Sequence, residues 1–294
     1  MQLLDLTLPT PAENLAGDEA LLDWREAEPG PDILRFWTPD RHFVVLGYAN
    51  KVAREVDLEA CRARQVPILR RCTGGGAVLQ GPGCLNYALI LNLEQWPGLR
   101  SITQTNCFIM QRHAQALVSL PGGAASSSPS SPREERVGRG PRRGETNKNA
   151  PPLPSPLLHP MEEREKSRSF MQPWLPGAPV TVEGFTDLAV NGLKFSGNAQ
   201  RRKRRTLLFH GTFLLDFDVS LVEKLLRPPS RQPAYRENRS HTEFLTRLGC
   251  EASSIKAALQ KVWNAKEPLA VIPTAAISQL VQNKYATEEW NLKW

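Results

Sequence analysis

The sequence contains no CxxC pair, no long apolar run and no secretory leader. Its cysteines are odd in number and scattered, so neither a disulfide framework nor a zinc site is indicated; they are Cys61, Cys72, Cys84, Cys107 and Cys250. Such usage is typical of reduced thiols in a cytosol. No stretch of about 18 apolar residues occurs, which excludes a membrane-spanning helix. The N-terminus MQLLDLTLPTPAENL lacks the basic region and apolar core of a signal peptide. We therefore expect a cytoplasmic protein without a membrane partner.

The charge of the chain is positive but unevenly spread. The 294 residues, 40% of them hydrophobic, suit one large domain or two small ones with a sizeable core. Of the net charge of +7, the segment 121–179 contributes +3, from nine Lys/Arg against six Asp/Glu. The rest is concentrated in RRKRR at 201–205, which is typical of a solvated face or of a contact with an acidic partner. Nucleic-acid binding is not favoured by so local an excess.

The segment 121–179 is rich in proline, serine and arginine and has almost no apolar periodicity. It cannot bury enough apolar surface to offset its ordering entropy, so we expect a disordered insertion. Its PPLPSP run is alternatively a polyproline II ligand for a partner. The flanking segments are interpreted as parts of one fold, so the predicted divisions are 1–120, 121–179, 180–250 and a short helical extension over 251–294.

The pattern of apolar residues predicts a mixed α+β fold without the repeated βαβ order of a doubly wound sheet. Helices are expected over 14–28, 52–64, 103–120, 253–263 and 275–285, and strands over 32–37, 42–49, 66–71 and 84–93. The turn TPDR is expected to join the first two strands as a hairpin. Two further hairpins are predicted, one at Asn191-Gly192, where both residues tolerate positive φ, and one at His210-Gly211.

Three consecutive glycines, Gly74 to Gly76, lie between an Arg-Arg pair and the strand-like AVL run. Glycines that adopt positive φ can present their backbone N–H groups as an anion-binding nest, and the arginines add positive charge beside it. This predicts a site for a phosphate or carboxylate. A tight turn between two buried strands is the alternative.

Lys194 and His210 are the other candidate site residues. Lys194 lies between the expected Asn-Gly turn and Gly197, a setting that fixes its ammonium group in space, although a strand lysine can also be a plain surface charge. His210 is either a functional group or a hydrogen-bonded histidine of the sheet.

Four blocks in this order resemble the lipoate-protein ligase A type of the biotin/lipoate protein ligase family. They are RRxxGGGAV, GxLNY, DLxVNGxKxSGNAQ and HGTxLLDxD, and NLAGDEALL and LRFW precede them in the matching order. The resemblance implies a largely antiparallel sheet packed by helices, like the class II synthetase and biotin–lipoate ligase catalytic domains. It further implies that ATP activates lipoate or octanoate to an acyl-adenylate, with Mg²⁺, before transfer to a carrier lysine. The implied carriers are the lipoyl domains of 2-oxoacid dehydrogenase E2 and the glycine cleavage H protein.

The resemblance also implies roles for individual residues. Lys194 would stabilise the charge that develops on the carboxylate and the phosphate, without acting as a nucleophile. The expected nucleotide-binding residues are Arg71, Gly74, Gly75, Gly76, Ala77, Val78 and Lys194. The expected acyl-substrate residues are Trp37, Arg70, Gly76, Gln80 and His210. No residue set stands out as a dedicated metal site.

Two departures from the family pattern bear on function. Gln80 stands where the family most often has histidine, so a hydrogen-bonding role can persist but a proton-transfer role cannot. The segment after the expected core is short for the accessory C-terminal domain of bacterial ligases, so a separate accessory subunit is expected to assist.

An octanoyltransferase is the competing enzyme, and it would pass the acyl group from acyl carrier protein through a cysteine thioester beside the lysine. In one branch of octanoyltransferases the cysteine lies just before the HG pair, and in another it lies in the loop ahead of the lysine block. No cysteine occurs between Cys107 and Cys250, and Cys72 and Cys84 match neither of these positions. The sequence therefore favours the ATP-dependent ligase. A non-catalytic binder of lipoyl domains is a further alternative, against which the retained Lys194 and glycine triplet argue.

Overall fold

The structure is a computed structural model that describes residues 1–99, 101–118 and 179–293. Its main element is an eight-stranded sheet with the order β11-β1-β2-β6-β10-β9-β8-β7. All pairs from β2 to β7 across this sheet are antiparallel, whereas β1 pairs in parallel with β2 and β11. The strands are β1 (Gln2–Asp5), β2 (Ile33–Trp37), β6 (Cys84–Asn92), β7 (Val180–Glu183), β8 (Asp187–Val190), β9 (Leu193–Arg202), β10 (Thr206–Leu214) and β11 (Glu267–Pro268). The predicted mixed, largely antiparallel α+β fold is confirmed.

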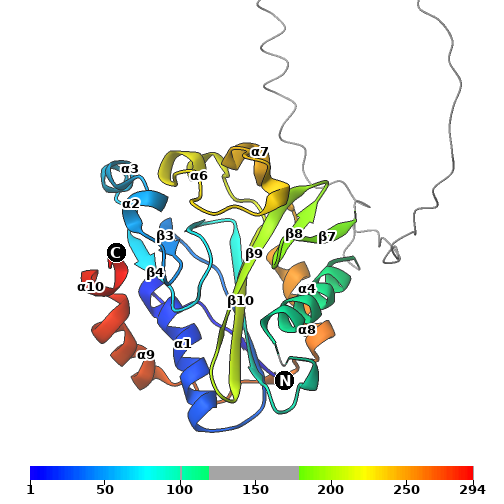
Figure 1. The fold of residues 1–294 in the computed structure, drawn as a ribbon. Coiled ribbons are helices and arrows are strands. Elements are labelled where there is room, and N and C mark those ends of the chain that lie inside the picture. The colour runs from blue at the N-terminus through cyan, green and yellow to red at the C-terminus, as the bar shows by residue number, and fades with distance from the viewer. Residues whose placement is uncertain (100, 119–178, 294) are drawn as a thin grey trace, which may run out of the picture. The chain divides into compact units, whose positions relative to one another are not determined.

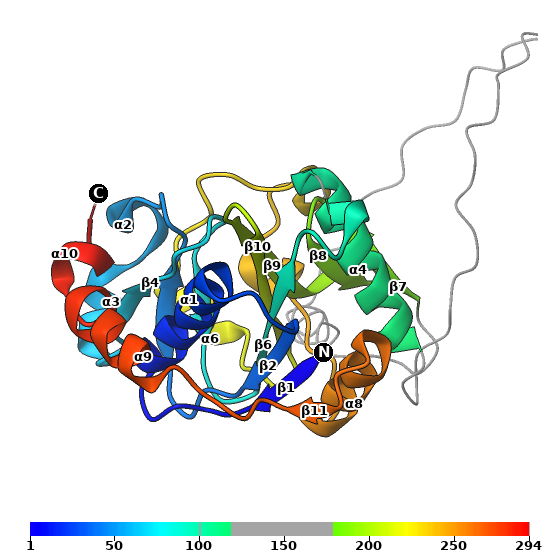
Figure 2. The same ribbon diagram turned by 90° about the horizontal axis from the view of Figure 1, so that it is seen from below.

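Helices cover both faces of this sheet, as Figures 1 and 2 show. Helices α1 (Pro11–Ala27) and α9 (Thr274–Leu280) lie on one side, and α4 (Ile102–Val118) and α8 (Ala252–Trp263) lie on the other. The period-2 alternation of β10 explains this arrangement, because Leu207, Phe209 and Phe213 join the core under α4 and α8, while Leu208 packs with residues of α1. The sheet is therefore buried on both faces.

Short elements complete the fold: α2 (Val52–Glu55), α3 (Leu58–Ala63), η1 (Pro97–Leu99), α6 (Ser220–Leu225), η2 (Ala234–Arg236), α7 (His241–Phe244), the π-helical turn η3 (Val281–Tyr285) and α10 (Glu288–Asn291).

A second, three-stranded sheet with the order β4-β3-β5 carries the glycine triplet. It consists of β3 (Phe43–Leu46), β4 (Ile68–Arg70) and β5 (Val78–Gln80), and the glycines connect β4 to β5. The predicted hairpin across TPDR is wrong, since β2 and β3 belong to different sheets. The apolar pattern located both strands, but each pairs with strands distant in sequence that the local pattern does not identify.

The expected helix over 52–64 is interrupted. It forms α2 and α3 with a break at Val56, which instead bridges Leu226, while the Asp57 carboxylate caps α3 by accepting from the N–H of Ala60. The other expected helices over described residues are present.

The two predicted hairpins have opposite outcomes. The Asn191-Gly192 hairpin is confirmed, with φ of 52° and 72° at the two residues between β8 and β9. The His210-Gly211 hairpin is wrong, because both residues lie inside β10, paired with β6 on one side and β9 on the other. Gly211 is needed there for a different reason, since the Asn198 side chain occupies the place of a Cβ.

The predicted disordered insertion over 121–179, with its PPLPSP run, lies almost entirely outside the described residues. No helix of the described part combines the length and the apolar character needed to cross a membrane.

Candidate active site

Lys194 occupies a defined position on the sheet. It follows the Asn191-Gly192 turn on β9, and its Nζ lies 2.9 Å from Oδ1 of Asp187 on β8. A Cβ at Gly197 would come within 2.8 Å of the same Nζ, so the ammonium group lies against the backbone of Gly197. The Lys194 side chain keeps 24% of its surface exposed. The site thus offers a charged donor that is anchored yet reachable from solvent.

The Asp187 carboxylate has a second partner. Its Oδ2 accepts a hydrogen bond of 2.8 Å from the hydroxyl of Tyr235, which is on η2. Burial, together with the Asp187 charge, raises the pKa of Tyr235 above its ordinary value, so the phenol stays protonated and donates.

Arg71 holds the glycine loop, residues 74–76, by hydrogen bonds to backbone carbonyls of the loop. The guanidinium Nη2 donates to the carbonyls of Gly74 (2.6 Å) and Gly76 (2.9 Å), and Gly75 has a φ of 95°. Within the described residues no hydrogen bond uses the N–H groups of the three glycines, which are exposed. Burial lowers the pKa of Arg71 to about 10, which leaves it charged at neutral pH. The loop therefore has three free backbone donors on a scaffold fixed by Arg71, the geometry expected of an anion nest.

Residues on both sides of this loop, Thr73 directly before it and Gln80 at the end of β5, contact β10 on the face where Lys194 lies. Before the glycines, Thr73 Oγ1 lies 2.7 Å from His210 Nε2. After them, Gln80 Nε2 donates to Thr212 Oγ1 at 2.6 Å. Thr212 is the register partner of Gly197, against which the Lys194 ammonium lies. The structure thus brings the glycine loop, Gln80, His210 and Lys194 to one face of the large sheet.

His210 belongs to a buried hydrogen-bond chain. Thr73 Oγ1 accepts from Arg71 Nε (3.0 Å) and lies 2.7 Å from His210 Nε2. Nδ1 of the same imidazole ring lies 2.9 Å from Asp18 Oδ2. The other Asp18 oxygen accepts from Arg35 Nη1 at 2.6 Å. This chain ties the start of the glycine loop through β10 to α1 and β2.

The sequence profile of the lipoyl protein ligase A/B catalytic domain matches residues 10–126 and 174–265. The chain belongs to this family. The resemblance stated from the sequence motifs is thereby confirmed, and both matched parts carry residues of the site just described.

Several relatives that match over nearly the whole chain are octanoyltransferases by name. The octanoyltransferase LipM of Brevibacillus brevis is 28% identical over 97% of this chain and 95% of its own length. LipM of Bacillus subtilis is 25% identical over 99% of this chain and 98% of its own length.

Solved structures of lipoate ligases share the fold. The bi-partite lipoate protein ligase of Thermoplasma acidophilum superposes with a TM-score of 0.69 at 19% identity, covering 99% of this chain and 95% of that one. A lipoate-protein ligase A bound with ATP gives a TM-score of 0.61 at 21% identity, covering 99% and 98%. At these identities the likeness concerns the fold alone.

Three residues beyond those expected contact the candidate site residues: Asp18 and Thr73 at His210, and Tyr235 at Asp187. Asp18 lies in the NLAGDEALL block and Thr73 directly precedes the glycines, so the motifs contained a signal for both. Tyr235 lies in a segment without any motif, and only the structure brings it to Asp187.

Gln80 is part of a closed polar triangle. It donates to Thr212, whose hydroxyl donates to Asn86 Oδ1, and the Asn86 amide donates back to Gln80 Oε1 at 3.0 Å. A glutamine fits this position because the triangle needs a donor and an acceptor from one side chain. Its expected contact with the acyl substrate stays a prediction.

The side chains of Arg70 and Trp37 are buried. Arg70 is fully buried, and its guanidinium donates to backbone carbonyls of two segments: those of Gly47, Tyr48, Asn50, Trp290, Asn291 and Lys293. Trp37 is 3% exposed and stacks on Phe43 with ring centroids 6.5 Å apart. Ala77 leads into β5, where Val78 pairs with Val45. The ligand-binding roles expected for these residues stay predictions.

All five cysteines lie within the described residues, and none is on β8, β9 or β10. Burial raises the pKa of Cys72 and Cys84 to about 12 and that of Cys250 to about 11. A thiolate nucleophile at neutral pH is therefore not provided by these three groups.

Most side chains of the basic run 201–205 have polar or charged partners within the molecule. Arg201 lies 3.4 Å from Glu19, Lys203 lies 2.5 Å from Asp23, and Arg205 donates to the carbonyl of Glu26 at 2.6 Å. These partners reduce the positive charge that the run offers to an acidic carrier.

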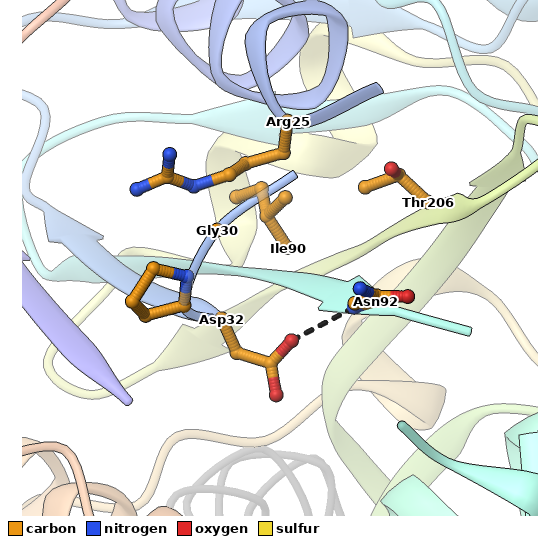
Figure 3. Close-up of a pocket in the computed structure, with 7 residues that line it drawn as sticks. Arg25, Gly30, Asp32, Ile90, Asn92 and Thr206 are labelled. Carbon is orange, nitrogen blue, oxygen red and sulfur yellow. Dashed lines mark hydrogen bonds between the residues drawn. The ribbon is translucent and has the colours of Figure 1, made fainter. Parts of the chain in front are cut away.

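The pocket in Figure 3 is not a substrate site. It lies where Asp32 accepts from the N–H of Asn92, at the far end of β6 from Asn86, and its volume is about 10 Å³. Such a volume holds about one water molecule. Among residues 1–99, 101–118 and 179–293, no group of three or more His, Cys, Asp or Glu side chains is arranged to hold a metal ion.

Proposed function

We propose that this chain is a protein acyltransferase of lipoylation, which passes an octanoyl group from a carrier-protein thioester to the lysine of a lipoyl domain. The full-length similarity to octanoyltransferases supports this activity, which the sequence motifs had offered as the alternative to an ATP-dependent ligase. The E2 lipoyl domains and the H protein are the proposed acceptors.

The observation that carries the proposal is the position of Lys194. Its ammonium group is anchored at Asp187 and Gly197, on the sheet face that Thr73 before the glycine loop and Gln80 after it contact. Acyl transfer develops negative charge on the carbonyl oxygen in the tetrahedral intermediate, and a fixed ammonium group stabilises that charge. Only one of its three N–H donors is needed by Asp187.

The placement of the cysteines favours direct transfer over a thioester on the enzyme. The neutral amine of the acceptor lysine attacks the octanoyl carbonyl, the C–N bond forms, and the C–S bond to the donor carrier breaks. The thiolate that leaves takes up the proton that the nitrogen releases. Lys194 stabilises the oxyanion in this scheme and forms no covalent bond.

The ATP-dependent ligase is the second candidate, and the same lack of a nearby reactive thiol favours it. The exposed, unused N–H groups of the glycine loop fit a phosphate, so this loop and Lys194 would hold the adenylate. ATP would supply the energy for activating free octanoate or lipoate. A separate accessory subunit belongs to this candidate.

The experiment supplies the full chain with an apo lipoyl domain and one of two donors, octanoyl-acyl carrier protein or octanoate with ATP and Mg²⁺. Intact-mass spectrometry of the lipoyl domain measures the octanoyl adduct. We expect an adduct with the thioester donor without ATP, and its loss in Lys194→Met. Lys256→Met is the matched control, because Lys256 also pairs with an aspartate (2.7 Å from Asp5) but lies on α8.

An adduct formed only with ATP overturns the transferase in favour of the ligase. Binding of the lipoyl domain without an adduct from either donor would instead identify a non-catalytic binder. Initial rates at varied concentrations of both substrates test direct transfer, for which intersecting double-reciprocal lines are expected in place of the parallel lines of a covalent intermediate.

A further inference from the structure

Lys194, Asp187 and Tyr235 form a linear cluster whose members come from three elements. Lys194 is on β9, Asp187 is on β8, and Tyr235 is on η2, 48 residues further along the chain than Asp187. Each Asp187 oxygen has its own partner, since Oδ1 lies 2.9 Å from the ammonium and Oδ2 lies 2.8 Å from the phenol oxygen. These two contacts, one at each oxygen, fix the orientation of the Asp187 carboxylate.

The segment that carries Tyr235 also holds the backbone around Lys194. Arg239 donates to the carbonyl of Gly192 at 3.2 Å, in the turn before the lysine, and to the carbonyl of Tyr235 at 2.7 Å. The N–H of Thr246 donates to the carbonyl of Lys194 itself at 2.9 Å. The 235–246 segment thus contacts Lys194 through the turn before it, its own carbonyl, and the Asp187 side chain.

The Tyr235 ring is independently anchored. It lies 5.0 Å from the ring of Phe244, and the left-handed φ of 55° at Gly184 lets the β7–β8 turn pass close to the ring. Because this packing holds the phenyl group, the hydroxyl is available to fix the carboxylate.

We propose that Tyr235 is a positioning residue for Lys194, acting through Asp187. This inference rests on the charge-stabilising role proposed for Lys194. A lysine side chain has several rotatable bonds, so without a fixed partner its ammonium would occupy many positions. With Asp187 held by Tyr235, one N–H donor points to the carboxylate and the other two remain for the reacting oxygen.

Tyr235→Phe tests the inference, because it removes the hydroxyl and keeps the ring against Phe244. We expect kcat for acyl transfer to fall roughly tenfold with little change in KM, since the hydrogen bond lost is to a charged group. Asp187→Asn should lower kcat by roughly a hundredfold, as the charged anchor itself is lost. Asp5→Asn is the matched control: it breaks a lysine–aspartate pair of similar length, to Lys256, and should leave kcat unchanged.

A second measurement does not depend on turnover. The ¹⁵N signal of the Lys194 ammonium, assigned by its loss in Lys194→Met, should be sharp in the wild type and broadened or lost in Tyr235→Phe. Unchanged kcat and an unchanged ammonium signal in Tyr235→Phe overturn the inference. A lowered melting temperature with unchanged kcat also overturns it, since Tyr235 would then be structural only. If the wild type transfers no acyl group from either donor, the proposed function fails, and the ammonium signal alone decides the role of Tyr235.

Discussion

At the scale of single residues, the lack of a side chain at Gly197 determines where the Lys194 ammonium lies. A Cβ there would come within 2.8 Å of Nζ, which is the mobile end of a flexible side chain. Gly197→Ala is therefore expected to displace the ammonium rather than the backbone, lowering kcat at least about tenfold while the free energy of unfolding changes by less than about 1 kcal/mol. Acyl-transfer kinetics and urea unfolding measure the two effects.

Gly98→Ala is the control for this prediction, because an added Cβ at Gly98 would have no atom within 4 Å. Full activity in Gly197→Ala would show that the position of the Lys194 ammonium does not depend on the missing Cβ of Gly197.

Thr73 is the second residue whose role is testable by itself. Its hydroxyl oxygen accepts from Arg71 and lies 2.7 Å from His210 Nε2, and all three residues are buried. Thr73→Val keeps the shape but removes the partner of the buried His210 Nε2, whereas Arg71 Nε keeps its bond to the Gly74 carbonyl at 3.1 Å. The free energy of unfolding should therefore fall by about 1–3 kcal/mol. Thr73→Ser retains the hydroxyl and should lose less than half as much. Urea denaturation of both variants measures this, and a loss in Thr73→Val no larger than that in Thr73→Ser would contradict the role of the hydroxyl.

At the scale of elements, Arg70 joins α10 and the residues that follow it to the 47–50 segment. Its guanidinium donates to carbonyls of Trp290, Asn291 and Lys293 on one side and of the 47–50 segment on the other. Gly47 in turn has no room for a side chain because the Gly75 carbonyl lies against it. The end of the chain is thus connected to the glycine loop through one arginine.

Arg70→Lys should release this connection, because a lysine has three donors in a compact group where the arginine has five in a planar fork. We expect the free energy of unfolding to fall by about 2 kcal/mol or more and amide exchange over 288–293 to accelerate. Hydrogen-exchange mass spectrometry measures the second effect. Arg41→Lys, at an exposed arginine, is the control. Unchanged exchange over 288–293 would contradict the role of Arg70.

The elements also show which parts of the site follow from the sequence. Asn191-Gly192 forms the expected turn because its positive φ values depend only on local residues, whereas Gly211 is required by Asn198 from the neighbouring strand. Both guanidinium groups of the Arg-Arg pair before the glycines donate to backbone carbonyls, and the ligand roles expected for the pair stay predictions. Charge and motif locate such residues, but their partners come from segments distant in sequence, as with Tyr235.

At the scale of the whole molecule, His113 links α4 to α8, the two helices on the face opposite the site. Trp263 Nε1 donates to His113 Nε2 at 2.9 Å, which requires a neutral imidazole. Burial, with a smaller contribution from Arg112, lowers the pKa of His113 to about 3. In the unfolded chain a histidine has its ordinary pKa of about 6.5.

This difference predicts a loss of stability in acid. Above pH 6.5 neither state binds the proton, and below it the unfolded state binds a proton that the folded state does not. The contribution of His113 to the free energy of unfolding should therefore fall by about 1.4 kcal/mol per pH unit between about pH 6.5 and pH 3. His113→Gln keeps an acceptor for Trp263 and does not titrate, so it should be less stable than the wild type at pH 7 but lose less on acidification. Urea unfolding of both proteins at half-unit steps from pH 7 to pH 4.5 measures the two slopes, and parallel curves would show that His113 takes up its proton in the folded state.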